Sequence, residues 1–366
     1  MQKTTTNNSE SFLDSLFVIS QSNNTQKTYS VVIRRFQRFL SEKYGIDEFQ
    51  LLSKIQNDEL DIFQMLQNYV VFQNKTGLSA KTIRVHFSVI RGYLRHIGIR
   101  IDRDDLKEFV KIPKQTKLRE VPITKEILVR VLRNANPKLQ TAILVASSTG
   151  LRIGELAQLK ISDIDFSTTP TMIFVRGETT KTKMSRETFL TTEATNTLKD
   201  FLKRFHKWSE NSANSSMSEK YIFGPVIKPK AKGRFSVDSA IFTLSQSLRI
   251  LLKSNPDLEI RNENGRMAIH FHAFRKFFRT NLGNIAGRDY AEALMGHSFY
   301  MDTYYQLPED KKKQMFLDAE PYITISDFEA VEKNIKKLSE KNSQLEEKFN
   351  DLLQYLRINS IEVPIF

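Results

Sequence analysis

The chain has 366 residues, 40% of them apolar, and its 55 Lys and Arg against 42 Asp and Glu give a formal net charge of +13. The length favours two domains, and the charge favours a polyanionic partner, with nucleic acid first and a membrane surface second. The chain contains no cysteine, which excludes disulfides, thiolate nucleophiles and cysteine-ligated metal sites. It has no apolar run long enough to span a membrane and no apolar signal core near its start, so we expect no membrane segment and a cytoplasmic location.

The first part of the sequence predicts a small helical domain. Residues 1–24 are polar and rich in Ser, Asn and Thr, so we expect them to be mostly disordered, although a short helix could form at "FLDSLFVI". Residues 25–112 contain two segments with apolar residues at helical spacing. The first, "TQKTYSVVIRRFQRFLSEKYG", stops at Gly45. The second, "SAKTIRVHFSVIRGYLRHIG", has Ser79 to cap its start and Gly98 to cap its end.

Basic residues follow the polar faces of these helices and continue into a linker. Arg34 and Arg84 lie on faces that are either simply solvated or in contact with a nucleic acid. Residues 113–122 have a proline at each end and few apolar residues, which is typical of an interdomain linker. In and just before this linker stand four cationic residues that could contact phosphate: Lys111, Lys114, Lys117 and Arg119.

Residues 123–322 mix helix and strand signals, which indicates a second domain of the α+β type. Within it, "MIFVRGETTKTKMSRETFLT" (residues 172–191) predicts a strand, a polar turn and a second strand. The segment "VDSAIFTLSQSLRILLK" predicts a buried helix. We therefore expect a mainly α-helical chain with a small antiparallel β-sheet.

The stretch "STGLRIGELAQL" places an arginine and a glutamate at the start of a helix. Thr149 and Gly150 predict a turn, and the helix is expected to begin around Leu151. Arg152 then stands near the helix start, where backbone N–H groups also favour an anion. Glu155 lies three residues later, so it can orient the guanidinium. The alternative is an ordinary Arg–Glu pair on the surface.

Two further stretches carry histidines. In "HFHAFRKFFRT", His272 and Arg275 share one face of a helix, and three phenylalanines pack on its other side. In "LMGHSFYMDTYYQL", His297 is followed by Tyr304 and Tyr305. These tyrosines could line a core, or one hydroxyl could be a nucleophile with the histidine beside it.

The arginine, the His-x-x-Arg pair, the Gly-His pair and the tyrosine, in this order, resemble the tyrosine recombinase (phage-type integrase) family. The continuation "YYQLPEDKKKQMFLDAEPY" resembles archaeal integrases in particular, which implies an archaeal or viral mobile element. The resemblance implies a helical, SAM-like core-binding domain followed by a mixed α+β catalytic domain. It also implies a nucleoid-associated enzyme that breaks and rejoins double-stranded DNA through a 3′-phosphotyrosyl intermediate, with no metal, ATP or other cofactor.

The resemblance also implies a role for each motif residue. Arg152 and Arg275 match the family's two arginines that clamp the non-bridging phosphate oxygens. His272 matches the histidine that assists proton transfer from the nucleophile. His297 matches the residue that donates a hydrogen bond to the phosphate.

A lysine on the turn of a β-hairpin protonates the leaving 5′-oxygen in the family. Lys181 stands five residues before Arg186, and this spacing fits the family's lysine best. Lys183 is the alternative.

The nucleophile is one of two adjacent tyrosines. The usual family spacing falls on Gln306, so the turn in this chain is expected to be shorter by one or two residues. Tyr304, with Leu307 three residues later, fits the common family ending and is favoured. Tyr305 fits the raw spacing better and remains the alternative.

Site-specific recombination is the leading prediction, with a homotetramer on paired DNA sites as the expected assembly. One alternative is a type IB DNA topoisomerase, which resembles the family in its catalytic residues. The other is a catalytically inactive DNA-binding protein on the same fold.

Residues 327–357 predict a coiled-coil tail. Their apolar residues recur at steps of three and four, with Asn342 in one core position. Such a helix could associate with copies of itself. The alternative is a single amphipathic helix that folds back on its own catalytic domain.

Overall fold

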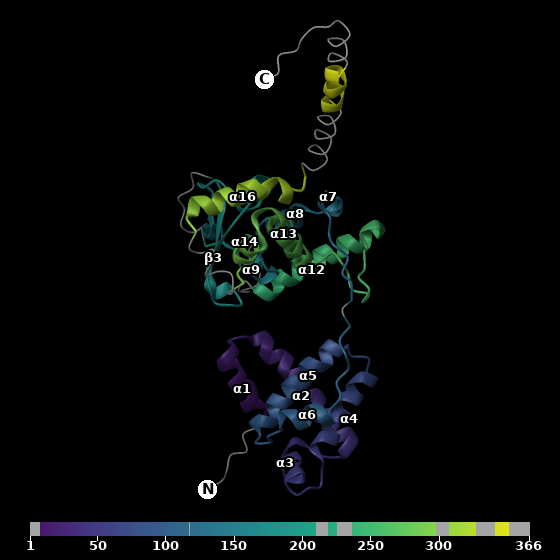
Figure 1. Ribbon diagram of the computed structural model, residues 1–366. Helices are drawn as coiled ribbons and strands as arrows, with labels where there is room; N and C mark the ends of the chain where they lie inside the picture. Colours follow the sequence, from purple (N-terminus) through teal and green to yellow (C-terminus); the bar gives the residue numbers. More distant parts are fainter. Residues whose placement is uncertain are drawn as a thin grey trace. The chain divides into compact units, whose positions relative to one another are not determined.

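The computed structural model describes residues 8–116, 118–209, 219–224, 236–297, 307–326 and 341–350. The chain divides into two compact units, Met1–Lys117 and Leu118–Phe366 (Figure 1). Both units are mainly helical, and the second also holds a small antiparallel sheet, so the expected fold class is confirmed. None of the described helices is long and apolar enough to cross a membrane.

The N-terminal unit packs its helices around one apolar core. Phe36, Phe39 and Tyr69 stand at the centre of this core, and none of them is more than 1% exposed. The Tyr69 ring lies 5.1 Å from both phenylalanine rings. The helices are α1 (Asn8–Ser20), α2 (Asn23–Tyr44), α3 (Glu48–Gln56), α4 (Ile62–Lys75), α5 (Ala80–His96) and α6 (Arg103–Phe109).

The expected disorder of residues 1–24 is wrong for the part that the structure describes. α1 covers "FLDSLFVI", so the short helix expected there is confirmed, and α2 begins at Asn23. Phe12 of α1 is buried against α5, with its ring 5.5 Å from that of Tyr93. One buried aromatic side chain therefore anchors a helix whose composition is otherwise polar. Residues 1–7 lie outside the described residues.

The two helices predicted from apolar spacing are confirmed as α2 and α5. α2 ends at Gly45, which adopts the left-handed conformation at φ 64°. The hydroxyl of Ser79 caps α5 by accepting a hydrogen bond from the Thr82 N–H. Gly98 follows the last residues of α5 at φ 97°.

The boundary between the two units, after Lys117, falls inside the segment predicted as a linker. Residues 118–122 make contacts within the C-terminal unit, because the backbone N–H groups of Arg119 and Val121 donate to Glu263 and Asn262 at 2.9 and 2.8 Å. By these contacts the second half of the predicted linker is part of the C-terminal unit.

The C-terminal unit is built around the buried helix α8, which contacts α10 and α13. α13 in turn packs on α14 and α16, and α8 also contacts α9, the helix that follows it. The helices are α7 (Lys125–Asn134), α8 (Pro137–Thr149), α9 (Ile153–Ala157), α10 (Thr192–His206), α12 (Val237–Ser254), α13 (Phe271–Ala286), α14 (Arg288–Leu294) and α16 (Glu309–Ile323).

A three-stranded antiparallel sheet in the order β1-β2-β3 lies in the same unit. Its strands are β1 (Ile164–Asp165), β2 (Met172–Val175) and β3 (Arg186–Phe189). β2 and β3 pair from Met172 opposite Phe189 to Val175 opposite Arg186, so the predicted strand–turn–strand segment is confirmed. The pairing places Arg186 at the start of β3, beside the turn that carries the lysines.

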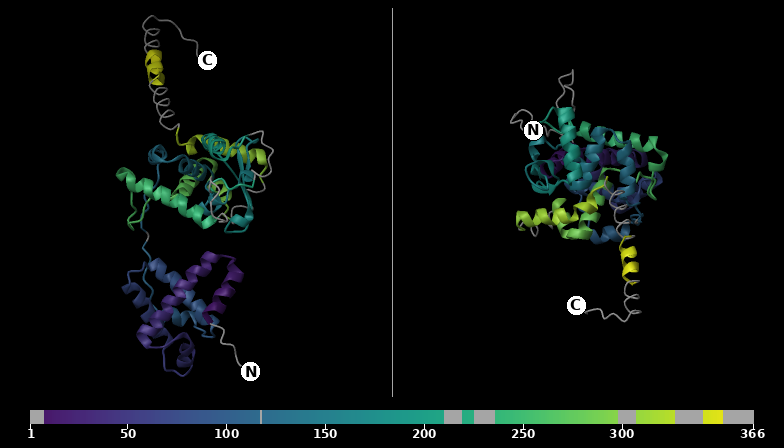
Figure 2. Two further views of the ribbon diagram at one scale, coloured as in Figure 1. Left: turned by 180° about the vertical axis from the view of Figure 1, so that it is seen from behind. Right: turned by 90° about the horizontal axis from the view of Figure 1, so that it is seen from above.

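The helix predicted over "VDSAIFTLSQSLRILLK" is confirmed as α12, but the expectation that it is buried is wrong. Leu244, Leu248 and Leu252 face the core, whereas Phe242 is 63% and Ile250 64% exposed. The helix lies along the surface of its unit in the views of Figures 1 and 2. The apolar run is therefore amphipathic, with two large side chains on its outer face.

Of the predicted tail, residues 341–350 are described, and they are helical. Leu345 is 58% and Phe349 60% exposed. The remainder of the predicted coiled coil, residues 327–340 and 351–357, lies outside the described residues.

Candidate active site

Arg152 stands at the N-cap of α9, directly after the turn that ends α8. Its Nη1 lies 2.9 Å from Oε1 of Glu155, and its backbone N–H donates to Oε2 of the same carboxylate at 2.9 Å. Glu155 is buried, with only 2% of its side chain exposed, whereas Arg152 is 29% exposed. The pair is therefore not the ordinary surface pair considered as the alternative: a buried carboxylate fixes an arginine that keeps access to solvent.

Arg186 of β3 holds the same carboxylate from its other side. Its Nη2 lies 2.7 Å from Oε2 of Glu155, and both side chains are 2% exposed. Burial alone would raise the pKa of Glu155, but the charges of Arg186 and Arg152 outweigh it and lower that pKa. Glu155 is thus ionised at neutral pH. We did not expect this role for Arg186, because 31 residues separate the two partners.

Arg275 connects the second and third motifs to the first. It is 1% exposed on α13, and it donates to the carbonyl oxygens of Gly150 and, at 2.9 Å, Met295. Its Nη2 also lies 3.3 Å from Nε2 of His297. Burial, followed by the charge of Arg152, lowers the pKa of Arg275 to about 9, so the guanidinium remains protonated at neutral pH.

His297 is oriented by a second buried carboxylate, which sequence reasoning missed. Nδ1 of His297 contacts Oε2 of Glu292, a residue of α14 that is 3% exposed. Arg279 donates to the other oxygen of this carboxylate. Burial would raise the pKa of Glu292, but its bonds to Arg279 and His297 lower it. A glutamate five residues before the histidine of a Gly-His pair is the signal that could have indicated this contact.

His272 lies on the first turn of α13, on the same face as Arg275 and largely exposed. Partial burial of the ring, together with the charges of Lys276 and Arg275, lowers the pKa of His272 below its ordinary value. The ring is therefore neutral at neutral pH, which is the state that can accept a proton. His270 occupies the N-cap position of α13 without a capping bond from its side chain, and its ring is 6.3 Å from that of His272.

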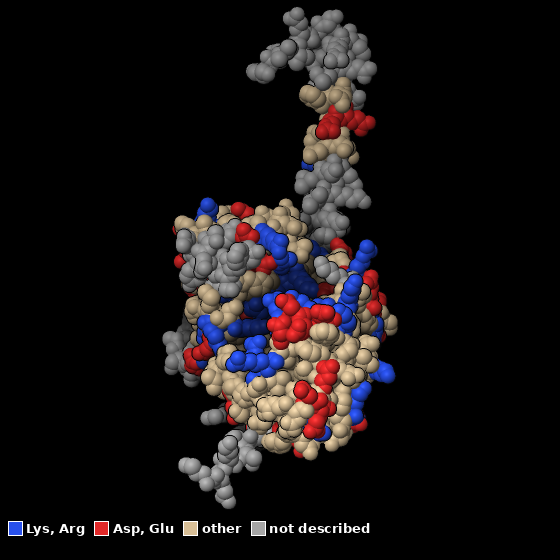
Figure 3. Space-filling view, turned by 60° about the horizontal axis from the view of Figure 1, so that its bottom comes forward, with Lys and Arg blue, Asp and Glu red and all other residues tan. Residues whose placement is uncertain are grey.

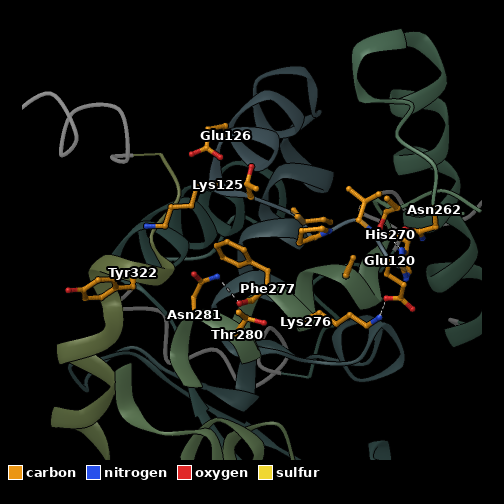
Figure 4. A pocket seen from close by; sticks show the side chains of 16 residues that line it. Glu120, Lys125, Glu126, Asn262, His270, Lys276, Phe277, Thr280, Asn281 and Tyr322 are labelled. Carbon is orange, nitrogen blue, oxygen red and sulfur yellow. Dashed lines mark hydrogen bonds and ion pairs between the residues drawn. The ribbon is translucent and has the colours of Figure 1, made fainter. Parts of the chain in front are cut away.

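A cavity of about 650 Å³ opens beside this part of α13 (Figure 4). It is lined by the segment that follows the linker, by α13 and by Tyr322 of α16. Glu120 pairs with Lys276 at its edge. None of its lining residues is Arg152, Arg186, Arg275 or His297, so the cavity is separate from the arginine cluster.

Lys181 and Lys183 both lie in the exposed turn between β2 and β3. Among the residues that the structure describes, neither lysine makes a hydrogen bond or an ion pair through Nζ, so both are free to reach a ligand. Lys183 adopts a left-handed conformation, with φ 59°. Tyr304 and Tyr305 lie in the interval 298–306, outside the described residues.

The predicted DNA-contacting residues are exposed wherever the structure describes them. Arg34 bonds to Ser30 Oγ at 3.0 Å and Arg84 to the Pro113 carbonyl at 3.3 Å. Lys111 Nζ lies 3.2 Å from the carbonyl of Lys107, and Lys114 and Arg119 are also exposed. Lys117 lies outside the described residues. Basic side chains gather into patches on the face shown in Figure 3.

The buried cluster has an excess of positive charge. Arg152 and Arg186 bond to one carboxylate, Glu155, whereas Arg275 bonds to carbonyl oxygens and to His297. Buried charges are costly unless they are paired, so this cluster is suited to bind an anion at the exposed edge of Arg152. Arg152, Arg275 and His297 form a group that can hold a phosphate. Neutral His272 can accept a proton.

The profile of the phage integrase family matches residues 100–306, which span all three motifs. The chain belongs to this family. The resemblance drawn from the order of the motifs is therefore confirmed, and with it the assignment to the tyrosine recombinase type of enzyme.

Two curated relatives support this result. The tyrosine recombinase XerC of Bacillus pumilus is 24% identical over 311 residues, which cover 80% of this chain and 89% of the relative. The tyrosine recombinase XerA of Thermococcus onnurineus is 26% identical over 171 residues, which cover 46% of this chain and 51% of the relative.

A solved structure agrees at the level of the fold. The lambda integrase(75–356) dimer bound to a COC′ core site superposes with a TM-score of 0.55 at 17% identity, over 84% of this chain and 94% of that one. The similarity extends across both units of the chain.

Proposed function

We propose that the protein is a site-specific DNA recombinase that breaks and rejoins DNA through a 3′-phosphotyrosyl intermediate. The observation that carries this proposal is the buried carboxylate of Glu155, which fixes Arg152 beside Arg275 and His297. Family membership supports the same reaction class. Tyr304 is the proposed nucleophile, with Tyr305 as the alternative.

The two guanidiniums of Arg152 and Arg275 are proposed to hold the non-bridging oxygens of the scissile phosphate. Negative charge accumulates on these oxygens as the tyrosine attacks, and preorganised donors stabilise that charge without reorganising. One such donor is worth roughly 3–4 kcal/mol of transition-state stabilisation in comparable sites. His297, oriented by Glu292, adds a further hydrogen bond to the phosphate.

Two proton transfers complete the proposed mechanism. A tyrosine hydroxyl has an ordinary pKa of about 10, so its attack at neutral pH needs a proton acceptor. Neutral His272 is suited to this role. The leaving 5′-oxygen needs a proton donor, and Lys181 in the exposed turn is proposed to supply it, with Lys183 as the alternative.

The bond energy of the phosphodiester is kept in the phosphotyrosine, so rejoining needs no ATP. We propose that the charge stabilisation that a metal would supply comes from the arginines, and activity in EDTA is expected. An absolute requirement for Mg²⁺ in the cleavage step would contradict this part of the proposal.

Double-stranded DNA is the proposed partner of both units, in the cytoplasm and associated with the nucleoid. The N-terminal unit would act as the core-binding domain, residues 25–112, and the segment from 123 to 322 as the catalytic domain. Contacts to phosphate are proposed for Arg34, Arg84, Lys111, Lys114, Lys117 and Arg119. A homotetramer on paired sites is proposed, and a solved lambda integrase tetramer bound to a Holliday junction has a TM-score of 0.54 with this chain.

The deciding experiment traps the covalent intermediate on a nicked suicide DNA substrate and maps the modified tyrosine by peptide mass. Tyr304→Phe is expected to abolish the adduct and leave DNA binding intact, and Tyr305→Phe is the matched control. The reverse result would make Tyr305 the nucleophile. Relaxation of supercoiled DNA without a specific site would instead favour the type IB topoisomerase alternative, and DNA binding without any adduct would favour the inactive DNA-binding protein.

A further inference from the structure

Arg186 is a fully buried arginine at the meeting point of three segments that carry motif residues. It begins β3, five residues after Lys181, and its side chain is 2% exposed. Its guanidinium contacts α9 through Glu155 and the end of α14 through the carbonyl of Leu294. A buried arginine is costly to desolvate, so an arginine at this position needs a reason beyond packing.

The first set of contacts fixes the carboxylate that orients Arg152. Nη2 of Arg186 lies 2.7 Å and Nη1 3.4 Å from the two oxygens of Glu155. Those same oxygens receive Nη1 and the backbone N–H of Arg152. Glu155 is thus held between two arginines, and a planar guanidinium that binds both oxygens sets the plane of the carboxylate. The direction of the Arg152 side chain follows from that plane.

The second set of contacts fixes the turn that carries His297. Nε of Arg186 donates to the carbonyl of Leu294 at 2.8 Å. Gly296, at φ 77°, lies so close that a Cβ there would be 2.8 Å from both Cδ and Nη1 of Arg186. Only glycine allows this approach, which explains the Gly in the Gly-His pair. Arg275 binds the intervening carbonyl of Met295, so both arginines hold one short turn.

We propose that Arg186 is a positioning residue for cleavage: it aligns Arg152, through Glu155, and the His297 turn, through Leu294 and Gly296, without touching DNA. This inference rests on the proposed function. Arg186 is buried and bonds to protein groups, so it has no path to the phosphate. This separates the role of Arg186 from those of Arg152 and Arg275. A displacement of about 1 Å in such an alignment can cost about 100-fold in rate.

The test uses Arg186→Lys in the full-length protein. Lysine keeps the positive charge that Glu155 needs, but one ammonium cannot bind both carboxylate oxygens and the Leu294 carbonyl in the same geometry. The rate of adduct formation per folded molecule on the suicide substrate is expected to fall about 10–100-fold, with the Kd for DNA nearly unchanged. Arg186→Met is less suitable, because it would leave Glu155 buried beside an apolar group and destabilise the fold.

A second substrate distinguishes alignment of the phosphate site from general loss of structure. In a methylphosphonate, a methyl group replaces one non-bridging oxygen and removes the negative charge that the arginines stabilise. If Arg186 acts through the arginine clamp, the ratio of wild-type to Arg186→Lys rates should be much smaller on methylphosphonate than on phosphate. A purely structural defect would lower both rates by the same factor.

The matched control is Arg176→Lys. Arg176 follows β2 and is 20% exposed, and its side chain bonds to Asp163 at 2.9 Å, to Glu178 and to the Gln158 carbonyl. Its substitution is expected to lower the Tm while leaving the adduct rate per folded molecule unchanged. An Arg186→Lys protein that cleaves phosphate at the wild-type rate, or is slowed equally on both substrates, would overturn the inference. A wild-type protein that forms no phosphotyrosyl adduct would instead overturn the proposed function on which the inference rests.

Discussion

Nη2 of Arg275 lies 3.3 Å from Nε2 of His297, so the second and third sequence motifs meet in one site. Nε2 faces an arginine that cannot accept a hydrogen bond, while Nδ1 faces the carboxylate of Glu292. Glu292 therefore orients the ring through Nδ1, and Nε2 faces the arginine cluster. The same arginine reaches the carbonyl of Gly150, which places the first motif beside the other two.

The two clamp arginines are predicted to differ in what their loss does to stability. Arg152→Ala and Arg275→Ala should each slow adduct formation by about 10²–10³, the magnitude for a transition-state donor, with little change in DNA affinity. Arg152 is partly exposed, and Glu155 still pairs with Arg186 when Arg152 is removed. The Tm of Arg152→Ala should therefore change little. Arg275→Ala leaves the carbonyls of Gly150 and Met295 without their buried donor, which costs about 1–3 kcal/mol of stability.

Single-turnover cleavage, filter binding and thermal unfolding measure these three quantities separately. Equal losses in binding and cleavage would make the two arginines ordinary contacts to the DNA backbone.

Cleavage is predicted to slow at acid pH through protonation of His272. Partial burial and the charges of Lys276 and Arg275 hold its pKa below the ordinary value, so the neutral, proton-accepting form dominates at neutral pH. The rate should be flat above the ordinary histidine value of about 6.5 and fall as pH drops through the lowered pKa. The free energy of unfolding should depend on pH in the same direction, because the unfolded chain binds the proton more readily than the folded one. The stability that His272 contributes is fully present above its unfolded pKa and is lost as pH falls through its lowered folded pKa.

A rate profile between about pH 5 and 8 checks this prediction. Lys276→Gln removes a positive charge near the ring and frees Glu120, and both changes should move the acid limb to higher pH. His272→Gln should slow cleavage and remove the limb. A limb that survives in His272→Gln would belong to another group.

Affinity for DNA is predicted to fall steeply with salt, because neutralised phosphates release their counterions. If Arg34 and Arg84 each contact a phosphate, replacing either with glutamine should reduce the slope of log K against log[salt] by about 1. Arg130 of α7, which pairs with Asp257, serves as the control. Its replacement with glutamine should leave the slope unchanged. A response to salt that is flat in the wild type would contradict a phosphate interface on the N-terminal unit.

The tail is predicted to associate with copies of itself. In the described part, residues 341–350, the side chains of Leu345 and Phe349 are more than half exposed and form an i, i+4 pair on one helix face. A peptide of residues 327–357 should be helical and oligomeric. Asn342→Leu should raise its thermal stability and broaden its distribution of oligomer sizes, because a polar core residue sets register at a cost in stability. Sedimentation as a monomer at high micromolar concentration would instead favour a helix that folds back on its own catalytic domain.

The sequence alone determined those features that depend on residues close together in the chain. The apolar spacing of α2 and α5 and the alternation of the β2–β3 hairpin are local patterns, and all three elements form as predicted. The pairing of Arg152 with Glu155 also follows from their spacing, because residues three apart are neighbours on a helix. The order of the motifs was enough to indicate the family.

Tertiary structure decided the features that depend on which surfaces meet. α1 is ordered because Phe12 is buried against α5, and α12 is half exposed because its unit has no partner for Phe242 among the described residues. The roles of Arg186 follow from contacts to Glu155 and Leu294, 31 and 108 residues away. Such contacts have no local signature, because the attraction between charged groups becomes strong only away from water, and burial is set only when the helices and the sheet have packed.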